Sequence, residues 1–233
     1  MKINKILIIA AIASVTINSC KKGCNDPEAN NFEEKAKKDD GTCDYTPMIT
    51  LNGSASVFVR IGENYTELGA TAATNNGTSL DVTVDNTAVN TSTAGTYTVT
   101  YTATYEGDIA TASRTVTVGV DQDSYVGDWT CASDCGTTVF PVDGTRTIVA
   151  GTGSTQIQID GFFTLLGGSV VANISGLDIV VPQQTIPVTG GDITLSGTGS
   201  MNAAGTAFTI DYSYDNTIPL IGGSGTCTAT YSL

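Results

Sequence analysis

From Thr46 to the C-terminus, apolar and polar residues alternate in short stretches that Gly, Asn, Asp and Pro interrupt. The alternation is clearest where threonines separate Tyr97, Val99 and Tyr101. A repeat of two residues places one set of side chains on one face of a β-strand and the next set on the other face. Turn residues such as Asn52-Gly53 recur roughly every eight to twelve residues. This pattern predicts an all-β protein of short strands.

The pattern divides into two predicted domains. Residues 47–120 have the strand and turn spacing of a small β-sandwich. Residues 121–233 contain many short strand candidates and no amphipathic helical stretch, which fits an antiparallel barrel or double-sheet sandwich because both hide their strand edges. The candidates include Gln156–Ile159, Phe162–Leu165, Asp178–Val181, Thr185–Val188 and Thr226–Leu233. In the last of these, the residues predicted to face the core are Cys227, Ala229, Tyr231 and Leu233.

The N-terminus has the features of an export signal. Lys2 and Lys5 precede the apolar run Ile6–Ile17, which is too short for a permanent membrane-spanning helix and suits a secretory signal. With a small residue before Cys20, it resembles a bacterial lipoprotein signal, which implies that residues 1–19 are removed and Cys20 is acylated. An ordinary signal that leaves Cys20 as a thiol is the alternative. In many Gram-negative lipoproteins, an Asp directly after the acylated cysteine retains the protein at the inner membrane. This chain has Lys21 at that position, so the resemblance implies an outer-membrane lipid anchor, on the cell surface or facing the periplasm.

The charge distribution excludes several classes of function. The chain has 23 acidic and 10 basic residues, and from Thr46 onward the basic residues are only Arg60, Arg114 and Arg146. Nucleic acid as a partner is excluded, because binding its phosphates depends on Lys and Arg. The same region lacks His and Lys, so it cannot form a Ser-His-Asp, Cys-His or Ser-Lys site or a histidine-ligated zinc site. We therefore expect no enzyme, with a carboxylate-pair glycoside hydrolase as a remote alternative.

Residues 20–46 are predicted to be a lipidated cysteine and a stapled linker. The segment is charged and too poor in apolar residues to form a core, so a Cys24–Cys43 disulfide is expected to hold it together. It resembles a short cysteine-bracketed module of secreted and surface proteins of Bacteroidetes. The resemblance rests on Gly23–Pro27, Ala29–Phe32, Asp39–Cys43 and Tyr45. Its aspartates offer oxygen ligands for Ca²⁺, and a spacer without metal is the alternative.

The next domain also has a family resemblance. Residues 47–118 resemble the bacterial Ig-like domain of pesticidal crystal proteins and of many Bacteroidetes lipoproteins. The matching stretches are Pro47–Gly53, Ile61–Glu67, Gly69–Ala72, Asn90–Ala103 and Ala110–Val118. The resemblance implies a β-sandwich that serves as a spacer or adhesion module, which says little about function. In the linker that follows, Asp121 and Asp123 are candidate Ca²⁺ ligands, with a polar hinge as the alternative.

The C-terminal domain has two resemblances. Gly127-Asp128-Trp129 resembles the Gly-x-Trp signature of lipocalins, in which the Trp plugs the closed end of an eight-stranded barrel. The domain as a whole resembles the C-terminal domains of Bacteroidetes lipoproteins. That resemblance rests on Tyr125–Trp129, Ser133–Gly136 and Thr226–Tyr231. It implies a Cys135–Cys227 disulfide, which leaves Cys131 as a buried thiol; a Cys131–Cys227 bridge is the alternative.

Phe162 and Phe163 are the candidate ligand-binding residues. Consecutive residues of a strand point to opposite sides, so one of the pair, with Phe163 favoured, is expected to face solvent, a loop or a ligand. Aromatic faces stack on sugar rings. The sequence therefore predicts a lipid-anchored, non-catalytic binding or adhesion protein of the cell envelope, with a glycan or a surface protein as partner. A structural or assembly role in an outer-membrane complex is the alternative.

Overall fold

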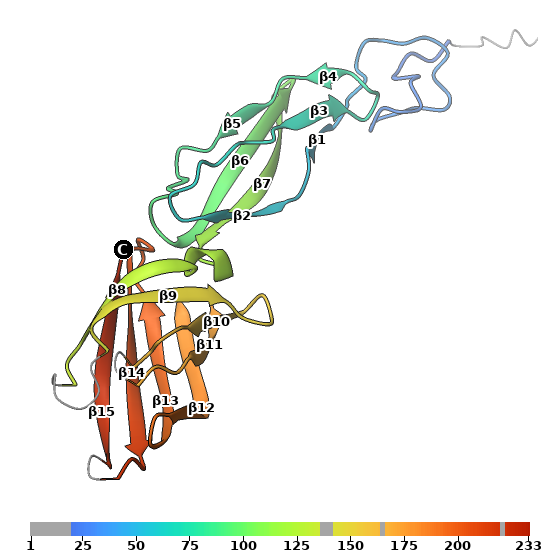
Figure 1. The fold of residues 1–233 in the computed structure, drawn as a ribbon. Coiled ribbons are helices and arrows are strands. Elements are labelled where there is room, and N and C mark those ends of the chain that lie inside the picture. The colour runs from blue at the N-terminus through green and yellow to red at the C-terminus, as the bar shows by residue number, and fades with distance from the viewer. Residues whose placement is uncertain (1–19, 136–141, 164–165, 220–221) are drawn as a thin grey trace, which may run out of the picture. The chain divides into compact units, whose positions relative to one another are not determined.

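A computed structural model describes residues 20–135, 142–163, 166–219 and 222–233 of the chain (Figure 1). Its regular secondary structure consists of β-strands and one short 3-10 helix, η1 (Gln122–Ser124). This confirms the all-β fold class. The predicted signal, residues 1–19, lies outside the described residues.

The chain divides into two compact units. One contains the residues up to Met48 together with Ala72–Asp81 and Ala103–Ala110. The other contains Ile49–Thr71, Val82–Thr102 and Thr111–Leu233.

Seven strands make up the two sheets of the Ig-like region. They are β1 (Pro47–Leu51), β2 (Ser56–Arg60), β3 (Ala70–Thr74), β4 (Ser79–Leu80), β5 (Thr83–Asp85), β6 (Gly95–Tyr105) and β7 (Asp108–Gly119). One sheet has the order β1-β3-β4 and the other the order β2-β7-β6-β5, in which β2 and β7 run parallel. The β6–β7 hairpin turns at Glu106 and Gly107, both with positive φ, as the turn signal predicts. The buried residues of the region's hydrophobic core are Val59, Val99, Tyr101, Val116 and Val118.

A buried ion pair lies beside this core. Arg114 is fully buried, and its Nη1 lies 2.5 Å from Oε1 of Glu67. The remaining guanidinium nitrogens donate to backbone carbonyls, including those of Ser54 and Asn52. Glu67 also accepts hydrogen bonds from the hydroxyls of Tyr65 and Tyr101 and from the backbone N–H of Gly69. Each charge is therefore both paired and hydrogen-bonded, which is the condition under which a buried ion pair is tolerated.

The carboxyl of Glu67 should make the stability of the Ig-like region depend on pH. Burial alone would raise its pKa, but the hydrogen bonds from Tyr101, Tyr65 and Gly69 and the charge of Arg114 together lower it. A lowered native pKa contributes stability that is complete above the unfolded-state pKa, about 4.3, and is lost as the pH falls through the native value. We expect the denaturant concentration at the midpoint of unfolding to decrease as the pH is lowered from about 5 to about 3. Glu67→Gln should flatten this dependence; an equally steep fall in that variant would contradict the assignment.

The C-terminal domain consists of eight further strands. They are β8 (Gly127–Ser133), β9 (Gly144–Ala150), β10 (Gln156–Ile159), β11 (Val170–Ser175), β12 (Asp178–Val188), β13 (Gly191–Met201), β14 (Ala207–Asn216) and β15 (Gly223–Ser232). Each pairs antiparallel with its neighbours in sequence, and β15 pairs with β8, with Tyr231 opposite Cys131. The sheet is therefore a closed up-and-down barrel, which settles the choice between barrel and double-sheet sandwich.

Aromatic side chains occupy the barrel interior. Trp129 is 1% exposed, packs edge-on against Phe208 at 5.0 Å between ring centroids, and donates from Nε1 to the carbonyl of Tyr125 at 2.8 Å. Phe208 in turn stacks on Tyr231. The predicted core position of Trp129 is confirmed. The predicted inward residues of β15 are buried except Leu233, which is 75% exposed because it lies beyond the last paired residue, Ser232.

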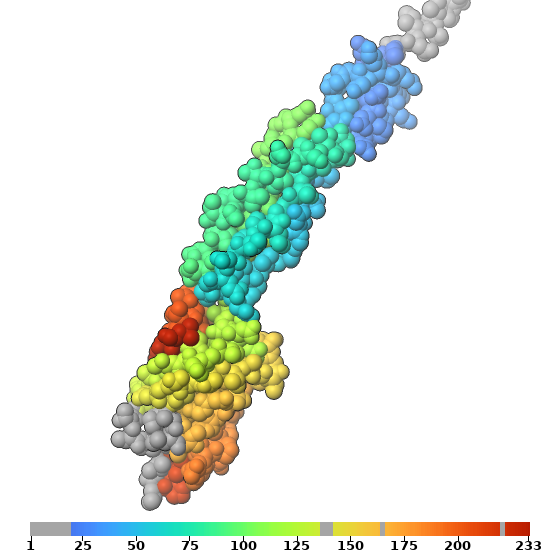
Figure 2. All heavy atoms as spheres, turned by 45° about the horizontal axis from the view of Figure 1, so that its top comes forward, coloured from blue at the N-terminus to red at the C-terminus, as the bar shows by residue number. Residues whose placement is uncertain are grey.

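Residues 20–46 form a small module with little regular structure, whose closely packed atoms are blue in Figure 2. The predicted Cys24–Cys43 disulfide is present, and the small side chains of Ala29 and Ala36 are buried. Within the same compact unit, Asn75 exchanges hydrogen bonds with the backbone of Thr46. This contact holds the C-terminal end of the module to the β3–β4 turn.

Candidate ligand-binding groove

An open groove of about 640 Å³ lies on the outer face of the barrel, over β13, β14 and β15. Its sides are outward-facing polar side chains, and between them Val181, Gly197, Tyr212 and Cys227 contribute to the floor. Asp134, which follows β8, lines one end. The polar lining residues are Asp134, Ser196, Thr198, Asp211, Ser213, Thr226 and Thr228.

The antiparallel register places these side chains in rows across the three strands. Thr198 lies opposite Asp211, which lies opposite Thr228. In the neighbouring row, Ser213 lies between Ser196 and Thr226. Neighbouring strands are about 4.8 Å apart, so each row presents a line of oxygen atoms at that spacing.

Thr228 holds the two carboxylates of the groove. Its Oγ1 donates to Oδ1 of Asp211 at 2.7 Å, and its backbone N–H donates to Oδ1 of Asp134, also at 2.7 Å. Among the described residues, the second oxygen of each carboxylate has no hydrogen-bonding partner. Both aspartates are exposed. The groove therefore offers two fixed carboxylate acceptors to hydroxyl or N–H donors from solvent.

A smaller hollow of about 180 Å³ adjoins the groove. Ser196 and Ser213 line both, and the smaller hollow adds Gln183, Tyr214 and Asp215. Tyr214 is half-buried and so exposes part of its ring. The hollow places an aromatic surface and an amide beside the hydroxyls and carboxylates.

The floor of the groove depends on a glycine and a buried tyrosine. A Cβ at position 197 would lie 2.5 Å from the carbonyl oxygen of Asp211, so only glycine fits where β13 approaches β14. Burial raises the pKa of Tyr212 to about 12. The floor of the groove is thus set by the close approach of β13 and β14.

The structure overturns the expectation for Phe162 and Phe163. Both are buried, at 0% and 1% exposed, and their rings pack edge-on with centroids 5.0 Å apart. Phe162 also packs against Tyr212 inside the barrel. Alternation between two faces does not apply, because the two residues lie outside the strands: Phe162 is in a bend after β10, and Phe163 forms only an isolated bridge with Gly167. The rest of that predicted strand, 164–165, lies outside the described residues.

The cysteines of the barrel pair as the family resemblance implies. Cys135 is bonded to Cys227, and Cys131 is a thiol that is 2% exposed. Burial raises the pKa of Cys131 to about 11, so it is a poor nucleophile at neutral pH. The alternative Cys131–Cys227 bridge is not the one in the structure. The remaining cysteine, Cys20, is exposed and forms no disulfide, as acylation requires.

Asp121 and Asp123 both contact one arginine. Nε of Arg60 lies 2.7 Å from Oδ2 of Asp121, and Nη2 lies 2.5 Å from Oδ2 of Asp123. Burial would raise the pKa of Asp121, but hydrogen bonds from Arg60 and Ser124 lower it. Calcium at these aspartates stays a prediction, and an ion there would compete with the guanidinium. Across the part of the chain that the structure describes, no group of three or more His, Cys, Asp or Glu residues is arranged to hold a metal ion.

Among the described residues, no helix has the length and apolar character needed to cross a membrane.

Sequence reasoning identified the outward-facing threonines of β15 but not the groove. The groove combines side chains from several strands, and the alternation within one strand does not show which polar residues become neighbours.

Comparison with known proteins identifies one part of the chain. Residues 49–118 match the family model described as the Ig-like domain of bacterial surface proteins. No curated protein shows significant similarity to the chain. Among solved structures, the lipoprotein BT2262 from Bacteroides thetaiotaomicron is similar with 16% identity and a TM-score of 0.31, over 80% of this chain and 100% of that chain. The part of the chain that these comparisons relate to known proteins by sequence is therefore residues 49–118, which are similar to the Ig-like domain of bacterial surface proteins.

Proposed function

We propose that this protein is a lipid-anchored, non-catalytic glycan-binding protein of the bacterial cell envelope, with its binding site in the groove over β13–β15. The observation that carries this proposal is the lining of the groove. Its polar residues supply hydroxyls and two carboxylates held by Thr228, and none of the lining residues is basic. A bacterial surface Ig-like domain at residues 49–118 supports a place in the envelope.

Carbohydrate fits this lining better than the other common classes of ligand. Sugar hydroxyls donate to carboxylates and exchange hydrogen bonds with Ser and Thr, and they leave no buried charge unpaired. Phosphorylated ligands would need Lys or Arg, which the groove lacks. The part-exposed ring of Tyr214 in the adjoining hollow offers an apolar face for a sugar ring.

Binding rather than hydrolysis is proposed because of how the carboxylates are held. Asp134 and Asp211 are exposed, and each already accepts a hydrogen bond from Thr228. A glycosidase needs one carboxyl kept protonated by an apolar environment beside one that stays ionised. The two aspartates share the same solvated environment.

A glycan array tests the proposal. Residues 20–233 with Cys20→Ser would be labelled and screened against bacterial and host glycans. We expect binding to a restricted set of glycans. If the groove alone binds them, reagents that chelate divalent cations should leave the binding unchanged. Absence of binding to every glycan, with the protein folded as shown by circular dichroism, would refute the glycan proposal.

Anchoring through Cys20 makes a separate prediction for cells. Cys20→Ser in the full chain should abolish incorporation of radiolabelled fatty acid and remove the protein from the outer-membrane fraction, because the acylated thiol is lost. Cys131→Ala is the matched control: it removes the other free thiol and should leave labelling unchanged. Wild-type protein found in the medium without acyl label would contradict the proposed anchor.

A further inference from the structure

The backbone of the N-terminal module gathers lysines next to Cys20. The N–H of Lys37 donates to the carbonyl of Lys21 at 2.8 Å, and the N–H of Gly23 donates to the carbonyl of Lys38 at 3.2 Å. Lys22 and Lys38 form a parallel bridge. Two lysine pairs that are sixteen positions apart in sequence therefore lie side by side, and the first pair directly follows the predicted acylation site.

Most of this positive charge is available to a partner. Lys21 is paired with Glu33 at 2.5 Å. Lys22, Lys37 and Lys38 are exposed, and the described residues give none of them an ion-pair partner. We call these three lysines the anchor patch.

The other basic residues cannot supply an equivalent surface. From Thr46 onward the basic residues are three arginines. Arg114 and Arg146 are 0% and 6% exposed, and Arg60 contacts three acids. The same region carries 16 acids, counted along the sequence. An anionic surface would therefore attract the anchor patch and repel the rest of the chain.

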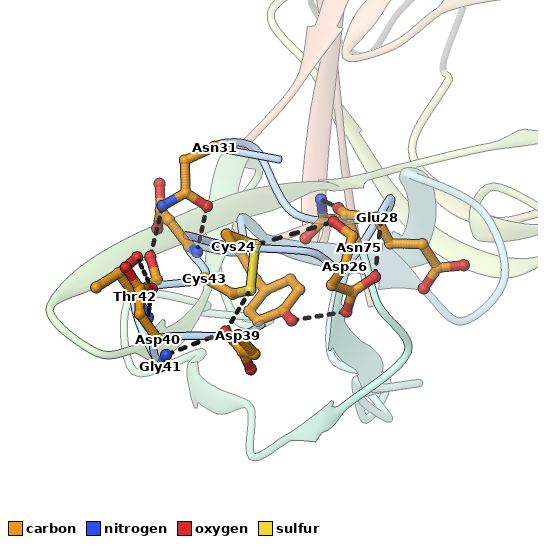
Figure 3. The surroundings of a disulfide bond; sticks show 12 residues. Cys24, Asp26, Glu28, Asn31, Asp39, Asp40, Gly41, Thr42, Cys43 and Asn75 are labelled. Atoms are coloured by element: carbon orange, nitrogen blue, oxygen red, sulfur yellow. Dashed lines mark hydrogen bonds between the residues drawn. A yellow bond between two sulfur atoms is a disulfide. The ribbon is translucent and has the colours of Figure 1, made fainter. Parts of the chain in front are cut away.

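Several acids of the module are engaged elsewhere. Figure 3 shows Asp26, Glu28 and Asn75 on one side of the Cys24–Cys43 disulfide, with Asp39 and Asp40 on the other. Asp26 accepts from the hydroxyl of Tyr45 at 2.7 Å. In the turn after Lys38, Oδ1 of Asp39 accepts the N–H of Gly41, and Oδ1 of Asp40 accepts the N–H of Thr42. These hydrogen bonds fix the carboxylates within the module but do not neutralise their charges.

We propose that the anchor patch docks on the phosphate groups of anionic phospholipids in the membrane leaflet that holds the Cys20 lipid. The inference rests on the proposed lipidation of Cys20, which would bring the patch to the headgroups. Lysines near an anionic leaflet strengthen membrane binding, and a basic patch next to an acyl chain is one of the combinations that give stable attachment. The patch would hold the module on the membrane while the acidic domains remain in solvent.

A vesicle assay tests the patch without depending on lipidation in cells. In residues 20–233, Cys20 is exposed and Cys131 is buried, so an alkyl maleimide should attach one chain selectively to Cys20. Sedimentation would measure binding to phosphatidylcholine vesicles with and without phosphatidylglycerol. We expect roughly 30- to 150-fold stronger binding with the anionic lipid, the order expected for two or three lysines at such a surface. Added salt should remove the preference.

Two variants separate the local patch from the total charge. Lys22→Gln with Lys38→Gln should lose most of the anionic preference. Asn64→Asp with Asn86→Asp changes the net charge by the same amount at exposed positions of the other compact unit and should retain the preference. Equal binding of the wild type to both vesicles, or an equal loss in both variants, would overturn the proposal. Loss of acyl labelling in cells would instead refute the anchor, and the vesicle result would be unaffected.

Discussion

Replacing Trp129 with alanine should destabilise the barrel by about 3–5 kcal/mol, the usual cost of removing a large buried aromatic side chain. The indole is 1% exposed, packs against Phe208 and hydrogen-bonds to the backbone of Tyr125. Its loss would leave a cavity and an unsatisfied carbonyl. Thermal unfolding by circular dichroism measures the effect. Alkylation of Cys131, which lies on the same face of β8, should become rapid under native conditions.

Two further variants show whether burial is the cause. Phe163→Ala should cost a similar amount, since that ring is 1% exposed. Val180→Ala, at a position that is 48% exposed on β12, should change the free energy of unfolding by about 0.5 kcal/mol or less. A Phe163 variant as stable as the wild type would mean that this ring does not belong to the core.

Replacing Arg114 with methionine should destabilise the Ig-like region by about 3–5 kcal/mol, because it leaves the carboxylate of Glu67, whose side chain is only 15% exposed, without its counter-charge. The carbonyls of Ser54 and Asn52 would also lose their donor. Trp129 is the only tryptophan, so its fluorescence reports on the barrel alone. We expect the fluorescence transition to stay in place while a second transition, seen by circular dichroism, moves to lower denaturant.

The exposed ion pairs of Arg60 provide the matched control. Arg60 is 37% exposed in its side chain and also contacts carboxylates, so Arg60→Met should cost about 1 kcal/mol or less. Adding Glu67→Gln to the Arg114 variant should recover part of the loss, because the uncompensated charge is then removed. Equal costs for the Arg60 and Arg114 variants would contradict a special role for burial.

The fold was predictable from the sequence because strand alternation and turn residues are local signals. β10 has the predicted bounds, Gln156–Ile159, and the inward face of Cys227, Ala229 and Tyr231 is buried as expected. The predicted strands 178–181 and 185–188 are instead one strand, β12, with a register irregularity between Val181 and Gln184. Pro182 interrupts the local pattern there, but pairing with β13 continues on both sides of it.

The candidate site was less predictable because it depends on which strands become neighbours. Asp211 and Thr228 are seventeen residues apart and meet only through the β14–β15 register. Asp134, which directly follows β8, accepts a hydrogen bond from the backbone N–H of the same threonine, where the pairing of β15 with β8 closes the barrel. The prediction for Phe162 and Phe163 was wrong for the opposite reason. A bend and an isolated bridge were taken for a regular strand, and the alternation of strand faces then assigned one ring to the surface.

The most direct test of the account is the affinity of glycans from the array for a chain with the groove filled. Ser213 lines both hollows, so Ser213→Trp should block them. Thr130→Trp, at an exposed position of β8 that does not line the groove, is the control. In calorimetric titrations of residues 20–233, we expect Ser213→Trp to weaken binding by at least about ten-fold, a loss of about 1.4 kcal/mol, and Thr130→Trp to bind like the wild type. Equal affinity of both variants for the same glycan would contradict a binding site in the groove.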